Sequence, residues 1–254
     1  MADHEFSDAV RQAAQSMIAS KIASKKMIVL TGAGVSKESG IPTFRDALTG
    51  LWANYSPEKL ATAEGFLSDP PLVWQWYDSR REMIKAVKPN AGHHALVELE
   101  KYVQELVVIT QNIDGLHRAA GSKTVIELHG NIGRITCFDN KHETEDVPFG
   151  LKEPPLCHCG SIMRPAVVWF GEALPEKELS QSFLLAEEAD LIMVVGTSGL
   201  VHPAASIPFL AKRHGAKVIE INPERTPISE IAEIRLEGAS AKILPDLLAA
   251  LKAQ

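Results

Sequence analysis

Short apolar runs alternate along the chain with longer segments of helical pattern. The runs with the length of a buried strand are Met27–Leu30, Leu106–Ile109, Val125–Leu128, Leu191–Val195 and Val218–Ile221. Apolar residues also recur at helical spacing before the first run, over residues 5–25, and Pro245–Ala253 is predicted to form a closing helix. Strands that alternate with helices indicate an α/β fold, here a Rossmann-like parallel sheet with helices on both faces.

Two segments interrupt this alternation. Residues 55–100 are rich in helix signals: Asp69 followed by Pro70 is typical of an N-cap with proline in the first turn, and Pro89 is expected to end that helix. Residues 137–165 contain all three cysteines, scattered prolines and little periodicity. We interpret both segments as insertions that form a smaller lobe against the main sheet.

The predicted domain division follows from these insertions. The small domain takes a helical insertion and a cysteine-containing, zinc-ribbon-like insertion, and the large domain takes the rest of the chain. In residue numbers the large domain is 1–54, 90–136 and 166–254, and the small domain is 55–89 and 137–165.

Composition excludes several classes of protein. The chain has 254 residues, 45% of them hydrophobic and 23% charged, as in an ordinary globular protein with one core and a small appended lobe. A net charge of −6 argues against non-specific nucleic-acid binding, which needs clustered positive charge. No apolar run reaches the ~20 residues of a membrane span. The acidic N-terminus has no signal-peptide core and three cysteines suit no disulfide framework, so we predict a cytoplasmic protein.

A glycine-rich segment, TGAGVSKESGIPTFRD, follows the first apolar run at Thr31–Asp46. Gly32 and Gly34 fit the start of the dinucleotide fingerprint G-x-G-x-x-G, but Lys37 stands at its third glycine and the next glycine is Gly40. The pattern is not a P-loop either. One interpretation is a plain strand-to-helix turn; the other is a pyrophosphate site of unusual spacing, built from backbone N–H groups.

Phe44 and Arg45, near the end of this segment, favour the second interpretation. An aromatic ring and a cation beyond a phosphate loop suit a mobile lid over a ligand. With them, the segment resembles the first motif of the sirtuin family, the NAD-dependent protein deacylases. Six motifs of that family occur in order over residues 27–250: Gly32–Ser36 with Gly40–Arg45, Thr110–His117, Leu128–Gly130, Val168–Glu172, Gly196–Ser198, and Asn222.

The resemblance implies that NAD and an acylated peptide bind in a cleft between a Rossmann-like domain and a smaller domain that carries zinc. NAD is then a co-substrate that is consumed, not reduced. The residues assigned to NAD by the resemblance are Gly32, Ala33, Gly34, Ser36, Thr43, Phe44, Arg45, Gln111, Asn112, Asp114, Gly196, Thr197, Ser198, Asn222 and Ser240.

The same resemblance implies the catalytic residues. Asn112 and Asp114 order the nicotinamide end of NAD and its ribose, while the acyl-lysine carbonyl oxygen attacks C1′ and nicotinamide leaves. His129 is the general base that deprotonates a ribose hydroxyl, a task that suits the pKa of histidine. The products are lysine, nicotinamide and O-acyl-ADP-ribose. Without the resemblance, the Asn112–Asp114 segment is compatible with a simple turn.

Substrate binding is predicted at two places. Val168, Trp169, Phe170 and Gly171 resemble the segment that pairs with the acyl peptide as an added strand. Tyr77 and Arg80 lie three residues apart on one predicted helix face and resemble the class III sirtuin pair that binds the carboxylate of succinyl-, malonyl- or glutaryl-lysine. Spacing alone leaves Arg81 as an alternative to Arg80. We expect removal of both acetyl and succinyl groups.

The zinc site departs from the family pattern of four cysteines in two close pairs. Cys137 has no paired cysteine, and the second pair is contracted to Cys157 and Cys159. A fourth ligand is open between His142, His158 and Asp139, and a site that binds no metal is the alternative. Zinc bound here is structural.

The sequence therefore predicts an NAD-dependent protein-lysine deacylase acting on acylated protein substrates, with no nucleic-acid or membrane partner. A sirtuin-like mono-ADP-ribosyltransferase is the alternative, because it uses the same NAD site. A non-catalytic NAD sensor is disfavoured by the joint presence of His129, Asn112 and Asp114. The sequence does not reveal the oligomeric state.

Overall fold

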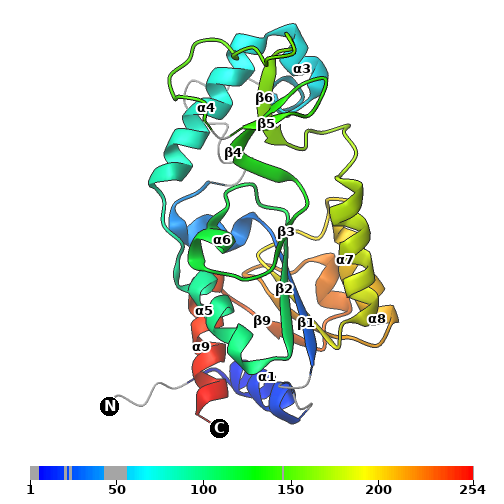
Figure 1. Cartoon of the computed structure of the whole chain (residues 1–254). Helices are drawn as coiled ribbons and strands as arrows, with labels where there is room; N and C mark the ends of the chain where they lie inside the picture. Colours follow the sequence, from blue (N-terminus) through cyan, green and yellow to red (C-terminus); the bar gives the residue numbers. More distant parts are fainter. Residues whose placement is uncertain (1–5, 20–21, 23–24, 43–55, 145, 254) are drawn as a thin grey trace.

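Six parallel strands form the central sheet of this computed structural model, which describes residues 6–19, 22, 25–42, 56–144 and 146–253. The strand order is β3-β2-β1-β7-β8-β9. Figure 1 labels β1, β2, β3 and β9 of this sheet. The strands are β1 (Lys26–Thr31), β2 (Glu105–Thr110), β3 (Val125–Glu127), β7 (Leu191–Val195), β8 (Lys217–Ile221) and β9 (Ile234–Leu236). Each of the five predicted apolar runs forms a strand. The sequence pattern did not indicate β9, because an Ile-Arg-Leu tripeptide is too short to stand out.

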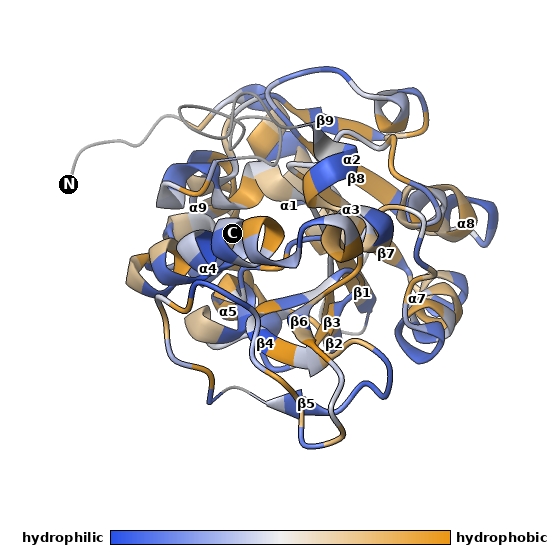
Figure 2. Ribbon diagram, turned by 90° about the horizontal axis from the view of Figure 1, so that it is seen from above, coloured by the Kyte–Doolittle hydropathy of each residue, from blue (hydrophilic) through white to orange (hydrophobic). Residues whose placement is uncertain are grey.

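Helices cover both faces of the sheet. The helices on one face are α1 (Asp8–Ala19), α5 (Ala91–Leu99) and α9 (Ser240–Lys252), and those on the other are α7 (Glu176–Glu188) and α8 (Ile207–Arg213). Figure 2 shows α5 and α9 to one side of the strands and α7 and α8 to the other. The shorter elements of this domain are α6 (Leu116–Ala120), η2 (Ala33–Ser39), η4 (Glu100–Tyr102), η5 (Ala204–Ser206) and η6 (Pro227–Glu230). The predicted α/β architecture is confirmed.

Helix α9 begins five residues before the predicted closing helix. Pro245 lies inside the helix, not at its start. The buried residues of α9 include Ile243 and Leu244, before the proline, and Leu247 and Leu251, after it. Burial of one apolar face therefore extends the helix through a residue that usually limits it.

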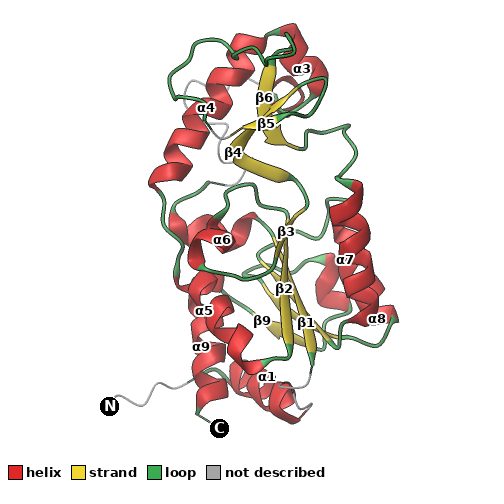
Figure 3. Cartoon of the chain, viewed as in Figure 1, coloured by secondary structure: helices red, strands yellow, loops and turns green. Residues whose placement is uncertain are grey.

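A second, smaller lobe carries a three-stranded antiparallel sheet of order β5-β4-β6 (Figure 3). Its strands are β4 (Gly130–Cys137), β5 (Glu143–Thr144) and β6 (Met163–Val167), and its helices are α2 (Pro57–Leu60), α3 (Ala63–Ser68) and α4 (Pro70–Ala86). The predicted domain boundaries after residues 136 and 165 fall inside β4 and β6. Residues 130–136 and 166–167, predicted for the large domain, thus belong to strands of the small sheet.

Helix α4 starts as its sequence predicts. The Asp69 carboxylate accepts a hydrogen bond from the backbone N–H of Leu72 at 3.2 Å, and Pro70 occupies the first turn. The helix ends at Ala86, three residues before Pro89. Its inner face buries Trp76 and Tyr77 in the small-lobe core. Across the described ranges, no helix combines the length and apolar character that a membrane span requires.

Candidate active site

The sheet changes winding direction between β1 and β7, and parallel sheets bind ligands at the carboxyl ends of the strands beside such a switch point. Gly32 follows β1 and Gly196 follows β7 at this edge. The Gly34 N–H donates to the Gly196 carbonyl at 2.8 Å, and a Cβ on Gly34 would lie 2.7 Å from the Gly196 Cα. Gly196 itself has φ +59°. These glycines are needed because two loop backbones touch here.

The loops after β2 and β8 join the same edge through Thr197. The Gln111 side-chain amide donates to the Thr197 hydroxyl at 2.9 Å, and the Asn222 amide donates to the Thr197 carbonyl at 2.8 Å. Ala33 and Ser198 are exposed on the surface of these loops. The structure thus brings four predicted NAD-binding segments to one edge of the sheet.

A buried polar cluster lies beneath the glycine loop. The Ser36 hydroxyl donates to Asp114 Oδ2 at 2.7 Å, and Asn112 Nδ2 donates to Ser36 Oγ at 3.2 Å and to the Gly32 carbonyl at 3.1 Å. The Leu116 N–H donates to the other Asp114 oxygen at 2.9 Å. Burial raises the pKa of the Asp114 carboxyl, while these donors act in the opposite direction. Asn112 and Asp114 are therefore held in fixed orientations.

His93 extends this cluster, although the sequence pattern indicated no role for it. Its Nδ1 accepts from the Asn90 N–H at 3.3 Å, so Nε2 carries the proton that faces Ser36 Oγ at 3.5 Å. The His93 ring lies 4.8 Å from the buried His117 ring, whose Nε2 is 2.9 Å from the Thr31 hydroxyl. Burial lowers the pKa of His93 to about 4 and that of His117 to about 3, so both rings are neutral.

His129 stands where β3 ends and β4 begins. Its Nδ1 lies 2.9 Å from the Gln111 carbonyl oxygen, which can only accept, so Nδ1 carries the proton. Nε2 is then the basic nitrogen, and no described residue is recorded as its partner. Burial lowers the pKa of His129 below 6.5, partly offset by this hydrogen bond. A neutral imidazole with one free lone pair is the state that a general base needs.

The predicted peptide segment runs directly past His129. Strand β6 ends at Val167, and the Val168 N–H donates to the His129 carbonyl at 2.9 Å. The Phe170 N–H donates to Ala61 at 2.8 Å, and Gly171 turns the chain with φ +85°. Phe170, just before this turn, is 57% exposed.

Tyr77 and Arg80 lie on adjacent turns of α4. The Tyr77 phenol is buried, and burial raises its pKa, which keeps it protonated. The Arg80 guanidinium lies 4.9 Å over the Trp76 ring, and its Nε is a buried donor that no described residue accepts from. Arg81, the alternative from spacing, is engaged elsewhere: it donates to the Val147 carbonyl and lies 4.4 Å over Phe149.

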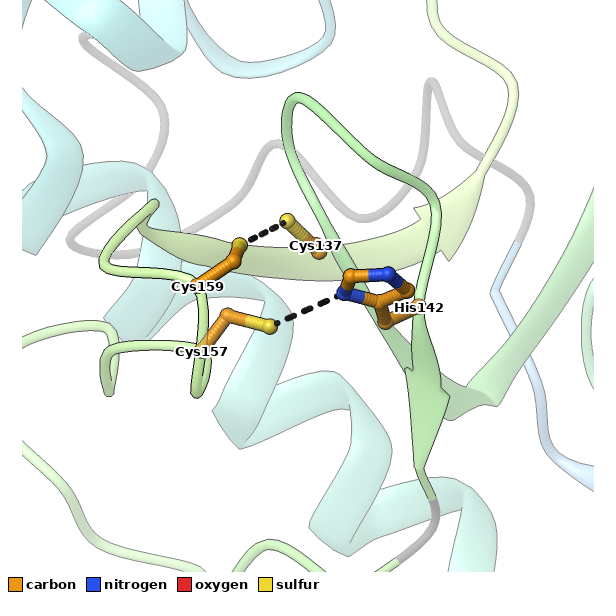
Figure 4. Close-up of side chains that lie close together, drawn as sticks. All are labelled: Cys137, His142, Cys157 and Cys159. Carbon is orange, nitrogen blue, oxygen red and sulfur yellow. Dashed lines mark hydrogen bonds between the residues drawn. The ribbon is translucent and has the colours of Figure 1, made fainter.

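A cluster of potential metal ligands lies between β4 and the loop before β6. The sulfurs of Cys137, Cys157 and Cys159 and a ring nitrogen of His142 all lie within 4.8 Å of one another (Figure 4). Cys157 and Cys159 both reach the cluster despite their short spacing. His158 stacks on His142 with ring centroids 4.5 Å apart but is not in the set. Three thiolates and one imidazole match a structural zinc ligand set.

Four further residues predicted to bind NAD are Thr43, Phe44, Arg45 and Ser240. Thr43, Phe44 and Arg45 lie outside the described residues. Ser240, in the first turn of α9, is buried and donates to Glu38 at the end of η2 through a 3.4 Å hydrogen bond.

The sheet, its switch point and the adjoining lobe define an α/β protein whose ligand site lies at the sheet edge. Comparison with known proteins identifies the family to which this chain belongs. Residues 32–203 match the Sir2 family. An NAD-dependent protein deacylase of Pyrococcus furiosus is 52% identical over 238 residues, which cover 90% of this chain and 95% of that protein. NAD-dependent protein deacylase 1 of Pseudomonas aeruginosa is 46% identical over 233 residues, 88% and 93% of the two chains.

Solved structures agree with this match. The crystal structure of a Sir2 homolog–NAD complex superposes with a TM-score of 0.86 at 43% identity, covering 94% of each chain. The structure of Sir2Af2 bound to a myristoylated histone peptide gives 0.75 at 35% identity, covering 97% of each. The chain belongs to the Sir2 family, and the predicted resemblance to the sirtuins is confirmed.

Proposed function

We propose that this protein is an NAD-dependent protein-lysine deacylase that removes both acetyl groups and the acidic succinyl and malonyl groups. The observation that carries the proposal is the state of His129. Its Nδ1–H is held by the Gln111 carbonyl at 2.9 Å, no described residue pairs with its other nitrogen, and its backbone carbonyl accepts from the Val168 N–H. A fixed, neutral base next to the segment proposed to hold the peptide suits deprotonation of a ribose hydroxyl.

NAD is the co-substrate in this proposal, and it supplies the ribose carbon to which the acyl oxygen is transferred. The glycine loop and the Gly196–Ser198 loop offer backbone groups at the switch point for its diphosphate. Asn112 and Asp114 present an amide and a carboxylate that are fixed by Ser36 before any ligand arrives. Such preorganisation favours the departure of nicotinamide, because the polar groups need no rearrangement as charge develops on the ribose.

The acidic acyl groups are assigned to Tyr77 and Arg80. A guanidinium and a protonated phenol are both donors, and a carboxylate offers two acceptor oxygens. The buried Arg80 Nε supports this assignment, because no described residue accepts from it and buried donors usually have an acceptor. The contacts of Arg81 with Val147 and Phe149 favour Arg80 over Arg81 for the role.

Zinc is proposed at Cys137, His142, Cys157 and Cys159, which fit the ion in donor type and number. The cluster links β4 to the loop before β6. When bound, zinc supplies a structural cross-link and takes no part in deacylation.

The test is a matched pair of mass-spectrometric assays on one lysine peptide, acetylated or succinylated, with NAD. We expect the protein to remove both groups, His129→Ala to lose both activities, and Arg80→Met to lose succinyl removal far more than acetyl removal. NAD consumption without loss of either acyl group would instead favour ADP-ribosyl transfer. Equal losses of both activities in Arg80→Met would contradict the carboxylate role of Arg80.

A further inference from the structure

Trp169 contacts the hydroxyl of Tyr77 directly. Its indole Nε1–H lies 2.9 Å from the Tyr77 oxygen, in the interior of the small lobe. We propose that Trp169 is a positioning residue that fixes the Tyr77 hydroxyl as a donor toward the ligand and thereby makes the acyl site selective for a carboxylate over an isosteric carboxamide. The inference rests on the proposed function, because it concerns the pair assigned to acidic acyl groups.

The direction of this hydrogen bond is fixed by chemistry. An indole N–H can only donate, so the Tyr77 oxygen accepts. A phenol has one hydrogen, and that hydrogen cannot also point toward Trp169. Tyr77 is 4% exposed, and no second partner of its hydroxyl is recorded among the described residues. The hydroxyl hydrogen therefore remains available to a ligand beside Arg80.

The Trp169 ring cannot easily turn away from Tyr77. The Arg164 guanidinium stacks 3.4 Å over the ring, and both Arg164 amino groups donate to the Glu172 carboxylate. Glu172 also accepts from the Trp169 backbone N–H at 2.8 Å. Phe66 packs against the ring with centroids 5.2 Å apart. The indole is thus held by Arg164 on its face, by the Phe66 ring and through its backbone.

The consequence is a site that presents donors only. Tyr77 and Arg80 both donate, so each finds an acceptor when the ligand ends in a carboxylate. A succinamyl group has the same shape, but its NH₂ meets a donor and leaves it unpaired, which is costly in a buried site. Without the indole N–H, the Tyr77 hydroxyl can rotate and accept from that NH₂.

The experiment compares kcat/KM for succinyl-lysine and succinamyl-lysine versions of one peptide. Trp169→Phe keeps an aromatic ring and removes the N–H, so we expect the succinyl-to-succinamyl ratio to fall by about tenfold. We expect Tyr77→Phe to lower the ratio as well, and the double variant Tyr77→Phe/Trp169→Phe to match Tyr77→Phe alone, because Trp169 acts through the Tyr77 oxygen.

An unchanged ratio in Trp169→Phe, or independent losses that multiply in the double variant, overturns the role of Trp169. A wild-type protein that removes no succinyl group overturns the proposed function together with this inference, so the two failures are distinguishable. A second measurement needs only Tyr77→Phe: the ¹⁵N indole resonance of Trp169 shifts and exchanges faster if Tyr77 is its acceptor. A resonance that does not move contradicts the hydrogen bond.

Discussion

His129 shows how one hydrogen bond and burial set the protonation state of the proposed general base. Because its pKa lies below 6.5, His129 is neutral at pH 7, and activity is lost only when acid protonates Nε2. We expect kcat/KM for the acetylated peptide to be level near pH 7 and to fall below pH 6.5. An acidic limb centred above pH 7 would contradict this assignment of the base.

Two buried histidines make folding stability depend on pH. His93 and His117 have pKa values of about 4 and about 3 when folded, below the ordinary 6.5. Between pH 6.5 and 4 the unfolded chain therefore binds protons that the folded chain does not. The free energy of unfolding accordingly decreases as the pH is lowered through this range. Each ring accounts for about 2 kcal/mol of unfolding free energy between pH 7 and pH 5.

Denaturant unfolding of His93→Asn at the two pH values tests this. We expect the loss between pH 7 and pH 5 to shrink by about 2 kcal/mol relative to wild type. His94→Asn, at the exposed neighbouring position, is the matched control and keeps the wild-type difference. Equal losses in wild type and His93→Asn would contradict a neutral buried His93.

Single residues also mark the limit of what sequence can tell. The family motifs made His129, Asn112 and Asp114 candidates, but nothing near His93 signals that it lies against Ser36, since the two are 57 positions apart. The choices between Arg80 and Arg81, and between His142 and His158, were likewise open. Each depends on which way a side chain points from a known element, and that is decided by tertiary packing.

Among the helices, α4 matters for the proposed acyl site, because it carries Tyr77 and Arg80. Its N-cap is the Asp69 side chain, which satisfies the Leu72 N–H. We expect Asp69→Ala to lower the unfolding free energy by about 1 kcal/mol. Glu82→Ala, at an exposed position of the same helix, is the control and should change it little. Equal effects of the two substitutions in thermal unfolding would contradict the capping role.

Elements were predictable where their pattern was long and bounded by clear signals. The five apolar runs and the Asp69–Pro70 helix start are examples. Strand β9 was not predictable, because it is only three residues long. The first turns of α9 were not predictable either, because Pro245 follows them and proline is typical of a helix start. The small sheet was missed because its strands, β4 to β6, pair across a cysteine-containing loop with little alternation.

In the whole molecule, the described residues of the small lobe form two hydrophobic clusters and include the three cysteines and His142 that are proposed to bind zinc. We expect about one zinc per chain by elemental analysis, and lower zinc content and a lower melting temperature in His142→Ala, because metal binding contributes to folding. His158→Ala removes the stacked neighbour but no ligand, so it should retain zinc. Equal zinc loss in both variants would contradict the ligand set.

The two-lobe organisation was visible in the sequence as two interruptions of the α/β alternation, but its boundaries were not. The chain passes between the lobes within continuous backbone, so β4 begins directly after His129, with no linker to mark the change. Periodicity detects elements, while the division into lobes depends on which strands pair.

The most direct test of NAD-dependent deacylation by this protein is the fate of the acyl group. Mass spectrometry of a reaction with NAD and succinyl- or acetyl-lysine peptide would quantify nicotinamide, free lysine peptide and O-acyl-ADP-ribose together. We expect equal amounts of all three, with O-succinyl- or O-acetyl-ADP-ribose matching the peptide used. Free succinate or acetate as the initial product, or ADP-ribose attached to protein, would contradict it.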